Sequence, residues 1–161
     1  DIKQGKISSN IENLEKLHNK FSWIPGKEQI RPNKDVLEKK SNDMINMIPF
    51  YNSYSDYIYD IIFNYKMKIN QDGKLELDQK PNNNYIFRKN DYPYNVNNGT
   101  NHYVIWYNNK KEDITEDIIN LNITKELTKI NGNDQFEYIW YENPKKTFPL
   151  IYHLQVFWHK I

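Results

Sequence analysis

The hydrophobic periodicity of this chain changes from helical to strand-like near residue 66, and this change decides the fold class. Before it, apolar residues recur at the i, i+3, i+4 and i+7 spacing of an amphipathic helix, most regularly between Tyr54 and Tyr65. After it, residues 67–70 and 74–77 alternate around Asp72-Gly73, which predicts a β-hairpin. Helices followed by strands indicate an α+β domain with a mainly antiparallel sheet.

The remaining elements complete a single domain. Two helices are expected before Tyr54, and the second must stop at Pro49 because proline cannot donate its backbone hydrogen bond. In order, we expect helices over 11–21, 35–48 and 54–65, the hairpin, a strand over 102–107, a helix over 115–130 and strands over 136–141 and 150–159. We therefore predict a tail, short helix and linker over residues 1–34. Residues 35–161 should form one α+β domain, in which N-terminal helices precede a mainly antiparallel sheet with one further packed helix.

Aromatic residues dominate the candidate core. The chain has 161 residues, among them 13 Tyr, 7 Phe and 4 Trp, and a chain of this length normally forms one core. Its 22 basic and 21 acidic residues nearly balance, so any site for an anion must be local. The absence of cysteine excludes a disulfide framework, a thiolate zinc site and a cysteine nucleophile.

The sequence also predicts a cytoplasmic protein. No run reaches the ~20 apolar residues of a membrane span, and the start DIKQGKISSN has no apolar signal-peptide region. We therefore expect no membrane partner. The richness in Asn, Lys, Ile and Tyr is typical of AT-rich coding, which favours a protist or a giant virus as the source, with the host cytoplasm as the location in the viral case.

The stretch from Arg88 to Asn108 is where we expect the functional site. It joins a turn-dense polar loop, marked by Pro93 and Asn98-Gly99, to the strand that begins at His102. Binding and catalytic residues are commonly placed on loops held by a rigid scaffold. Alternation puts His102 and Trp106 on one face of this strand, and both faces have a mostly buried character.

Two histidines are candidate acid–base residues. His102 lies on this strand and His153 on the last strand, so the two imidazoles could meet if these strands are neighbours. Histidine titrates near pH ~6.5 and suits proton transfer. The structural alternative is that each histidine only donates to a backbone carbonyl. Asp91, the third candidate catalytic residue, could orient a histidine or bind a ligand hydroxyl together with Asn90, or the pair could form an Asx-turn before Pro93.

Four sequence blocks resemble the fungal and giant-virus N-acetylglucosamine-induced protein family. They are Asn90-Asp91-Tyr92-Pro93-Tyr94, His102-Tyr103-Val104-Ile105-Trp106, Trp140-Tyr141-Glu142-Asn143 and His153-Leu154-Gln155-Val156. The resemblance extends roughly over residues 45–160 and favours a functional role for Asp91. It adds Tyr92, Tyr94, Asn143 and Gln155 as candidate ligand contacts. Gln155 stands where the family often carries a second histidine.

The other candidate contacts are basic or aromatic. Arg88, Lys145 and Lys146 could bind an anion, and Trp106 and Trp140 could stack on a sugar or a base, although strand tryptophans usually belong to the core. We expect no metal and no cofactor, because the histidines are scattered and no phosphate-binding or catalytic motif is present.

These residues support three hypotheses. The first is a protein that binds a small polar or phosphorylated ligand, such as a sugar, sugar phosphate or nucleotide, with histidine acid–base catalysis as an option. The second is a non-enzymatic module that binds RNA or an RNA cap by aromatic stacking. The third is a protein that docks a partner chain. The sequence leaves open whether the protein is an enzyme and what its oligomeric state is.

Overall fold

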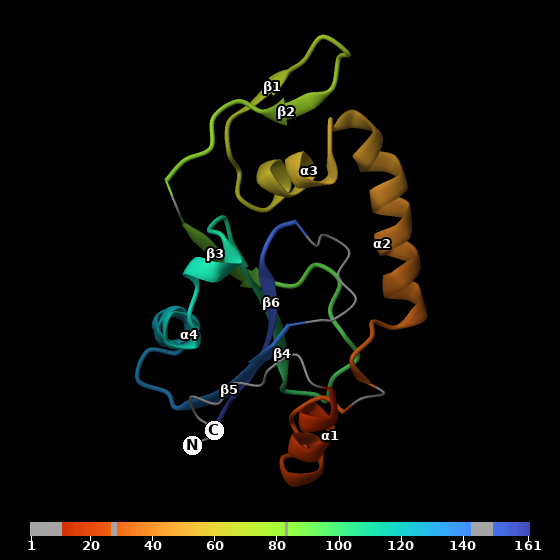
Figure 1. Ribbon diagram of the computed structural model, residues 1–161. Helices are drawn as coiled ribbons and strands as arrows, with labels where there is room; N and C mark the ends of the chain where they lie inside the picture. The colour runs from red at the N-terminus through yellow and green to blue at the C-terminus, as the bar shows by residue number, and fades with distance from the viewer. Residues whose placement is uncertain (1–10, 27–28, 83, 143–149) are drawn as a thin grey trace.

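The computed structural model describes residues 11–26, 29–82, 84–142 and 150–161. It has the predicted α+β architecture, in which helices surround an antiparallel sheet (Figure 1). The helices are α1 (Ile11–Lys20), α2 (Lys34–Met47), α3 (Tyr54–Ile61) and α4 (Glu116–Asn131), with short 3-10 turns η3 (Ile48–Phe50) and η4 (Lys111–Asp113). The strands are β1 (Met67–Ile69), β2 (Leu75–Leu77), β3 (Tyr85–Lys89), β4 (Asn101–Tyr107), β5 (Phe136–Tyr141) and β6 (His153–Lys160).

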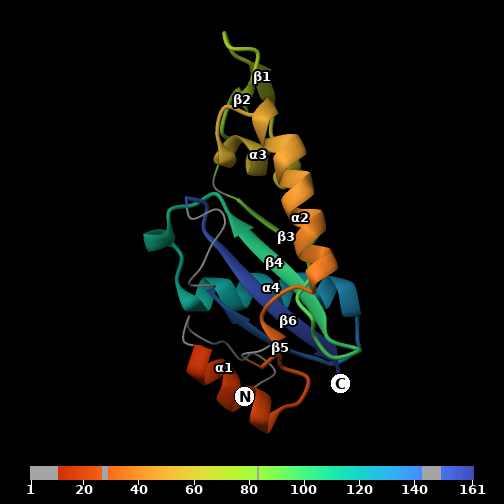
Figure 2. The same cartoon turned by 90° about the vertical axis from the view of Figure 1, so that its right-hand side faces the viewer.

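The strands form two antiparallel sheets of different size. Strands β3, β4, β6 and β5, in that order, make the central sheet, while β1 and β2 form the predicted hairpin, whose turn contains Gly73 at a φ of 76°. The hairpin lies against α3 at one end of the molecule (Figures 1 and 2). The Asp56 carboxylate of α3 accepts a hydrogen bond of 2.8 Å from the Leu77 backbone N–H, which ties the hairpin to this helix.

One face of the central sheet is covered by α4. The buried side chains of Ile119, Ile123 and Leu127 pack against Ile105, Leu154 and other residues of this face, as their near-helical spacing requires. Thr115 caps the helix by accepting a hydrogen bond from the Ile118 N–H, and Gly132 ends it at a positive φ of 60°. The sequence therefore predicted both ends of α4 closely.

The opposite face of the sheet, here called the front face, is covered by two separate groups of side chains. Around α3, Tyr57 and Ile58 belong to a cluster with Val104 and Trp106. Around α1, a second cluster contains these buried residues: Leu14, Ile24, Ile139, Tyr141 and Phe157. Residues before position 34 thus contribute to the core, while the predicted domain boundary at that position stays a prediction.

Helix α2 is the exception to the predicted helix packing. It begins and ends where the sequence predicts, since Pro49 falls in η3 directly after it. It has no buried residue, and Leu37 and Ile45 of its apolar stripe are 46% and 68% exposed. Figure 1 shows α2 as the outermost element at the right of the molecule, and Figure 2 shows it in front of the sheet. Leu37 and Ile45 of its apolar stripe therefore point away from the core, whereas Val36 and Met44 are half-buried.

No helix of the described residues is long and apolar enough to cross a membrane.

Candidate functional site

The strand register places His102 and His153 on the front face but not together. In the antiparallel pair of β4 and β6, His102 lies opposite Phe157, whereas His153 lies opposite Trp106. Four residues of strand separate the two positions, which corresponds to ~13 Å at ~3.3 Å per residue. The two strands are neighbours, which was the condition for the imidazoles to meet, but the register keeps His102 and His153 apart.

His102 is held as a neutral imidazole in one tautomer. Its side chain is 3% exposed, and its Nδ1 accepts a hydrogen bond of 2.9 Å from the Tyr94 backbone N–H. The proton must then be on Nε2, which donates to Gln155 Oε1 at 2.6 Å. Burial lowers the pKa of His102 to about 4, and the hydrogen bond to Gln155 only partly opposes this. Both ring nitrogens are therefore engaged in the folded protein near neutral pH.

Gln155 is the centre of a buried polar network. Its Oε1 accepts from His102 and also, at 3.3 Å, from the side-chain amide of Asn90. These donors fix the orientation of the amide, so its NH2 group points away from them. Gln155 is 6% exposed, and no described residue accepts a hydrogen bond from this NH2 group.

Asn90 links the loop to this network. Its side-chain oxygen accepts from the Tyr92 backbone N–H at 2.8 Å, which is the predicted Asx-turn, and its own N–H donates to the His102 carbonyl at 3.0 Å. Its side-chain nitrogen points to Gln155. The Asn90 side chain thus forms the Asx-turn with its oxygen and joins the polar network with its nitrogen.

Tyr141 lies on β5 directly opposite Gln155. It is 2% exposed, and its hydroxyl has no hydrogen bond of acceptable geometry in the described part of the chain. Burial raises the pKa of Tyr141, and the Tyr94 phenol approaches closely enough to raise it further. The four residues Asn90, His102, Gln155 and Tyr141 cross the front face from strand to strand, and we call them the polar row.

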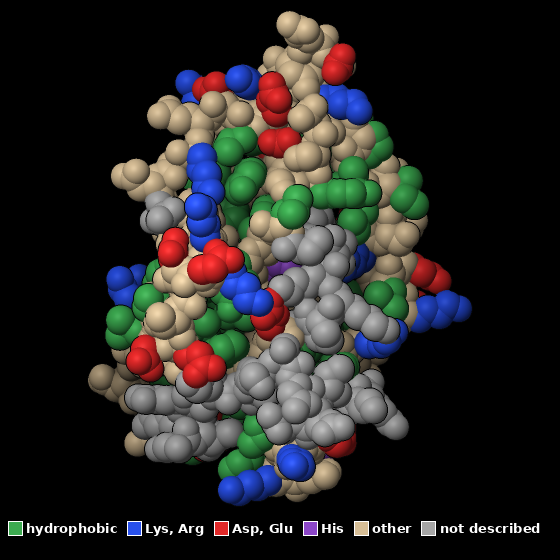
Figure 3. Space-filling model, in the orientation of Figure 1, with side chains coloured by type: hydrophobic (Ala, Val, Ile, Leu, Met, Phe, Trp, Pro, Cys, Tyr) green, Lys and Arg blue, Asp and Glu red, His purple; other side chains and the backbone are tan. Residues whose placement is uncertain are grey.

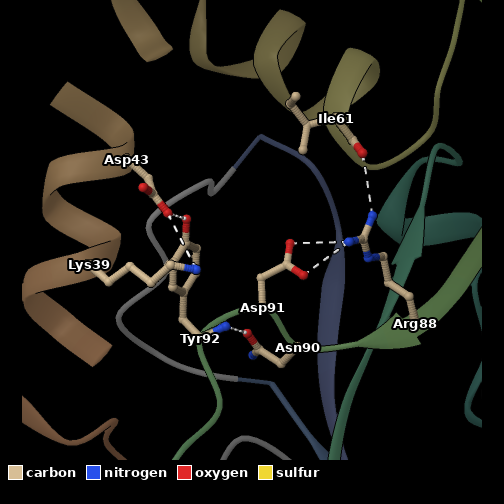
Figure 4. Close-up of polar contacts among 7 residues, drawn as sticks. All are labelled: Lys39, Asp43, Ile61, Arg88, Asn90, Asp91 and Tyr92. Atoms are coloured by element: carbon tan, nitrogen blue, oxygen red, sulfur yellow. Dashed lines mark hydrogen bonds and ion pairs between the residues drawn. The ribbon is translucent and has the colours of Figure 1, made fainter. Parts of the chain in front are cut away.

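Arg88 and Asp91 lie beside the polar row and pair with each other. The Arg88 Nη2 donates to both Asp91 oxygens at 3.0 and 3.2 Å, and Nη1 donates to the Ile61 carbonyl at the end of α3 at 3.3 Å (Figure 4). The two side chains are 36% and 48% exposed. Asp91 therefore anchors an arginine in this structure, rather than orienting a histidine, and Arg88 joins the loop to α3.

Tyr92 joins the same loop to α2. Its hydroxyl donates to Asp43 Oδ2 at 2.8 Å, and the Lys39 ammonium lies 5.9 Å from the centre of its ring (Figure 4). Burial raises the pKa of Tyr92, and the hydrogen bond to Asp43 raises it further. Asp43 was not identified from the sequence, where it is one of several charged residues of a helix.

His153 and Trp106 form a second aromatic group on the front face. Their rings stack with centroids 4.4 Å apart, and His153 Nδ1 donates to the Ile151 carbonyl at 2.8 Å. This contact is the backbone hydrogen bond expected in the structural alternative for this histidine. Both residues are buried, so the stack supports the sheet where β6 begins.

The remaining candidates lie elsewhere. Trp140 is on the opposite face, 4% exposed, with its indole N–H donating to Asn120 Oδ1 of α4 at 3.0 Å. A ligand on the front face therefore cannot stack on it. Asn143, Lys145 and Lys146 lie outside the described residues. Within residues 11–26, 29–82, 84–142 and 150–161, no group of three or more His, Asp or Glu could hold a metal ion.

Tyr141 is the main site residue that the sequence did not single out. It lies in the run Phe136–Tyr141, where large side chains on both faces hide which of them carries an unpaired polar group. The only signal was its place in one of the four blocks of the family resemblance.

Comparisons with known proteins add little to this geometry. No protein-family model matches the chain, and no curated protein matches it. A solved structure described as "Crystal Structure of HTC1" is similar over 96% of this chain and 85% of that chain, with 12% identity and a TM-score of 0.47. A likeness at this distance carries no argument, so the resemblance to the N-acetylglucosamine-induced protein family stays a prediction.

Proposed function

We propose that this protein binds a small, neutral, hydrogen-bonding ligand at the polar row. The observation that carries the proposal is the Tyr141 hydroxyl, which is buried and makes no hydrogen bond of acceptable geometry in the described part of the chain, although the Tyr94 phenol lies close enough to interact with it. The NH2 group of Gln155 lies directly opposite in the register and donates to no described residue, but its nitrogen is not a fully buried unpaired atom. Buried polar groups are almost always paired, so an unpaired buried hydroxyl requires an explanation, and a hydrogen bond to a ligand is one.

The electrostatics of the polar row favour a neutral ligand. None of its four residues is charged near neutral pH, because burial keeps His102 unprotonated. The nearby Arg88 is already paired with Asp91. Transferring an anion into the described surroundings of the polar row, where Arg88 is already paired, is strongly unfavourable. Among the ligands considered from the sequence, a sugar therefore fits the polar row better than a sugar phosphate or a nucleotide.

The geometry of His102 favours binding over acid–base catalysis. A general base needs a free lone pair within reach of the substrate proton. Here Nδ1 accepts from Tyr94 and Nε2 donates to Gln155. His102 is thus a positioning residue, which fixes the Gln155 amide so that its NH2 group is directed to the ligand.

The proposed family membership rests on the same residues. Each of the four blocks of the resemblance contributes one residue to the polar row: Asn90, His102, Tyr141 and Gln155. We propose on this ground that the chain is a member of the N-acetylglucosamine-induced protein family. N-acetylglucosamine is accordingly one of the first neutral sugars to test.

A thermal-shift titration tests the proposal. Neutral sugars, including N-acetylglucosamine, are compared with their phosphorylated forms, for the wild type, Tyr141→Phe and the control Tyr138→Phe on the opposite face. A ligand at 100 times its dissociation constant adds ~2.7 kcal/mol of apparent stability. We expect a neutral sugar to raise the melting temperature of the wild type and of Tyr138→Phe, and to raise that of Tyr141→Phe much less. Equal shifts in all three proteins, or shifts with phosphorylated sugars only, would contradict the proposal.

Partner docking is a second candidate, favoured by apolar side chains that remain on the surface. Phe50, Tyr54 and Ile45 are 64%, 58% and 68% exposed. Hydrophobic side chains gather over α3 and along α2 (Figure 3). Exposed apolar side chains are common singly, but a gathering of them often marks an interaction site. No such specific observation favours the RNA-binding hypothesis, because Trp140 is inaccessible.

A further inference from the structure

Helix α2 presents an apolar ridge on a side that does not face the body of the protein. Half-buried residues mark its inner side and include Val36, Lys40 and Asp43. The ridge consists of Leu37, Ser41 and Ile45, which follow each other at i, i+4 and i+8 and are all exposed. Its two apolar members are 46% and 68% exposed, although α2 is held to the loop through Asp43.

The ridge is symmetric about Ser41. A small residue stands at its centre, and a large apolar residue follows four positions away in each direction. A two-fold axis through Ser41 would place Leu37 of one copy against Ile45 of the other, and the reverse. Such reciprocal contacts define an isologous interface. Ridges of i±4 residues pack into one another in the commonest class of helix packing, and a small central residue lets the two helices approach closely.

The charges of α2 are compatible with the same operation. Positions at equal distances before and after Ser41 are brought together by an antiparallel pairing. Of the charged residues, Lys34 and Glu38 flank the ridge, and the operation relates Lys34 to Ile48 and Glu38 to Met44. No like charges therefore meet beside the ridge, while Lys39 and Asp43 lie on the opposite side of α2, where Asp43 accepts a hydrogen bond from Tyr92. Like charges in contact would oppose self-association, whereas this arrangement does not.

We propose that α2 is a self-association surface, through which two copies of this chain form a symmetric dimer with antiparallel α2 helices crossing at Ser41. The proposal is independent of the ligand proposed for the polar row. A single helix on each side provides less area than a standard interface of ~800 Å² per partner, so the dimer is expected to be reversible and to dissociate on dilution.

Cysteine cross-linking tests the register directly, because the chain contains no cysteine. With helix axes ~8–10 Å apart and Cα atoms ~2.3 Å from each axis, the two Ser41 Cα atoms would lie ~3.4–5.4 Å apart. The upper part of this range suits a disulfide. We expect Ser41→Cys to oxidise rapidly to a dimer. The matched control is Asn46→Cys on the same helix, exposed but turned ~140° away at ~100° per residue, which should oxidise much more slowly.

A mixed pair of variants tests the antiparallel direction. Leu37→Cys and Ile45→Cys should each cross-link slowly alone and rapidly when mixed, because the two-fold axis brings these positions together. Equal oxidation rates for Ser41→Cys and Asn46→Cys would overturn the proposal.

Sedimentation equilibrium provides the test without cysteine. Ile45→Glu should weaken dimerisation at least ~10-fold, because a carboxylate would be desolvated against Leu37. The control is Leu121→Glu on the outer side of α4, which is 70% exposed and should leave dimerisation unchanged. A wild type that stays monomeric up to millimolar concentration, or a dimer that Leu121→Glu weakens as much as Ile45→Glu does, would also overturn the proposal.

Discussion

Replacing Tyr141 by phenylalanine should make the free protein more stable. The substitution removes a hydroxyl that is buried without a hydrogen-bond partner in the described residues and keeps the ring, which stacks on Phe157 with centroids 5.9 Å apart. A buried hydroxyl without a partner costs ~1–3 kcal/mol in mutational series. We therefore expect Tyr141→Phe to raise the free energy of unfolding by about 1 kcal/mol, and the melting temperature by ~2–4 °C for a chain of this size.

The same substitution on the other face should have the opposite sign. Tyr138 also lies on β5 and is fully buried, but its hydroxyl donates to Asn120 Oδ1 at 3.1 Å. Removing it breaks this bond and leaves the buried end of Asn120 with one donor fewer, so Tyr138→Phe should lower the free energy of unfolding by ~0.5–1.5 kcal/mol. The pair of variants thus separates the hydroxyl from the ring.

Urea denaturation at neutral pH, without ligand and followed by circular dichroism, measures both changes. The denaturant slopes must agree with the wild type, so that shifts in midpoint report stability alone. A loss of 1 kcal/mol or more in Tyr141→Phe would show that the hydroxyl is paired in the free protein. The argument for an unfilled hydrogen-bonding position on the front face would then fail.

Two further predictions concern the loop and its histidine. Because burial lowers the pKa of His102 to about 4 from 6.5, the unfolded chain takes up a proton below pH 6.5 while the folded protein does not. The free energy of unfolding should therefore fall by ~3 kcal/mol as the pH is lowered from 6.5 to about 4. Urea titrations over this pH range measure the fall, which should be smaller in His102→Gln. Parallel pH profiles of the wild type and the variant would contradict the lowered pKa of His102. Tyr92→Phe breaks the 2.8 Å bond to Asp43, and the loss of ~1 kcal/mol should speed hydrogen exchange in α2 about fivefold while exchange in α4 stays unchanged. Hydrogen exchange followed by mass spectrometry measures both rates. Equal exchange in α2 of the wild type and the variant would show that Tyr92 does not hold this helix.

Local patterns explain which elements the sequence predicted. Four apolar residues, with acids early and lysines late, identify α4: Ile118, Ile119, Leu127 and Ile130. Asp72-Gly73 identifies the hairpin, because this signal too lies within a few residues of the element that it marks. The side of a helix that meets the core is not a local property. In α2 the stripe that includes Leu37 and Ile45 has the same spacing as a buried stripe, yet these side chains remain exposed, because α2 stands outside the layers that cover the sheet.

The site was predicted in part for the same reason. Alternation correctly placed His102 and His153 on strands, but whether they meet depends on the register between β4 and β6, which are about fifty residues apart in the chain. A shift of four residues would have joined the imidazoles. The register instead brings His102 within reach of Gln155, a contact that spacing along one strand cannot reveal.

The polar row, rather than the ion pair beside it, is the part of this structure that stability alone does not explain. Arg88 and Asp91 are partly exposed, and such pairs contribute little either way. Apolar side chains of similar size in place of His102, Gln155 and Tyr141 would pack against their apolar neighbours without unpaired donors, so the row lowers stability relative to that alternative. Local conflicts of this kind are expected where a fold keeps a binding site. Asn90 connects the loop to the polar row through its Asx-turn and its hydrogen bond to Gln155. A ligand that binds Gln155 must therefore also affect the position of the loop that holds α2.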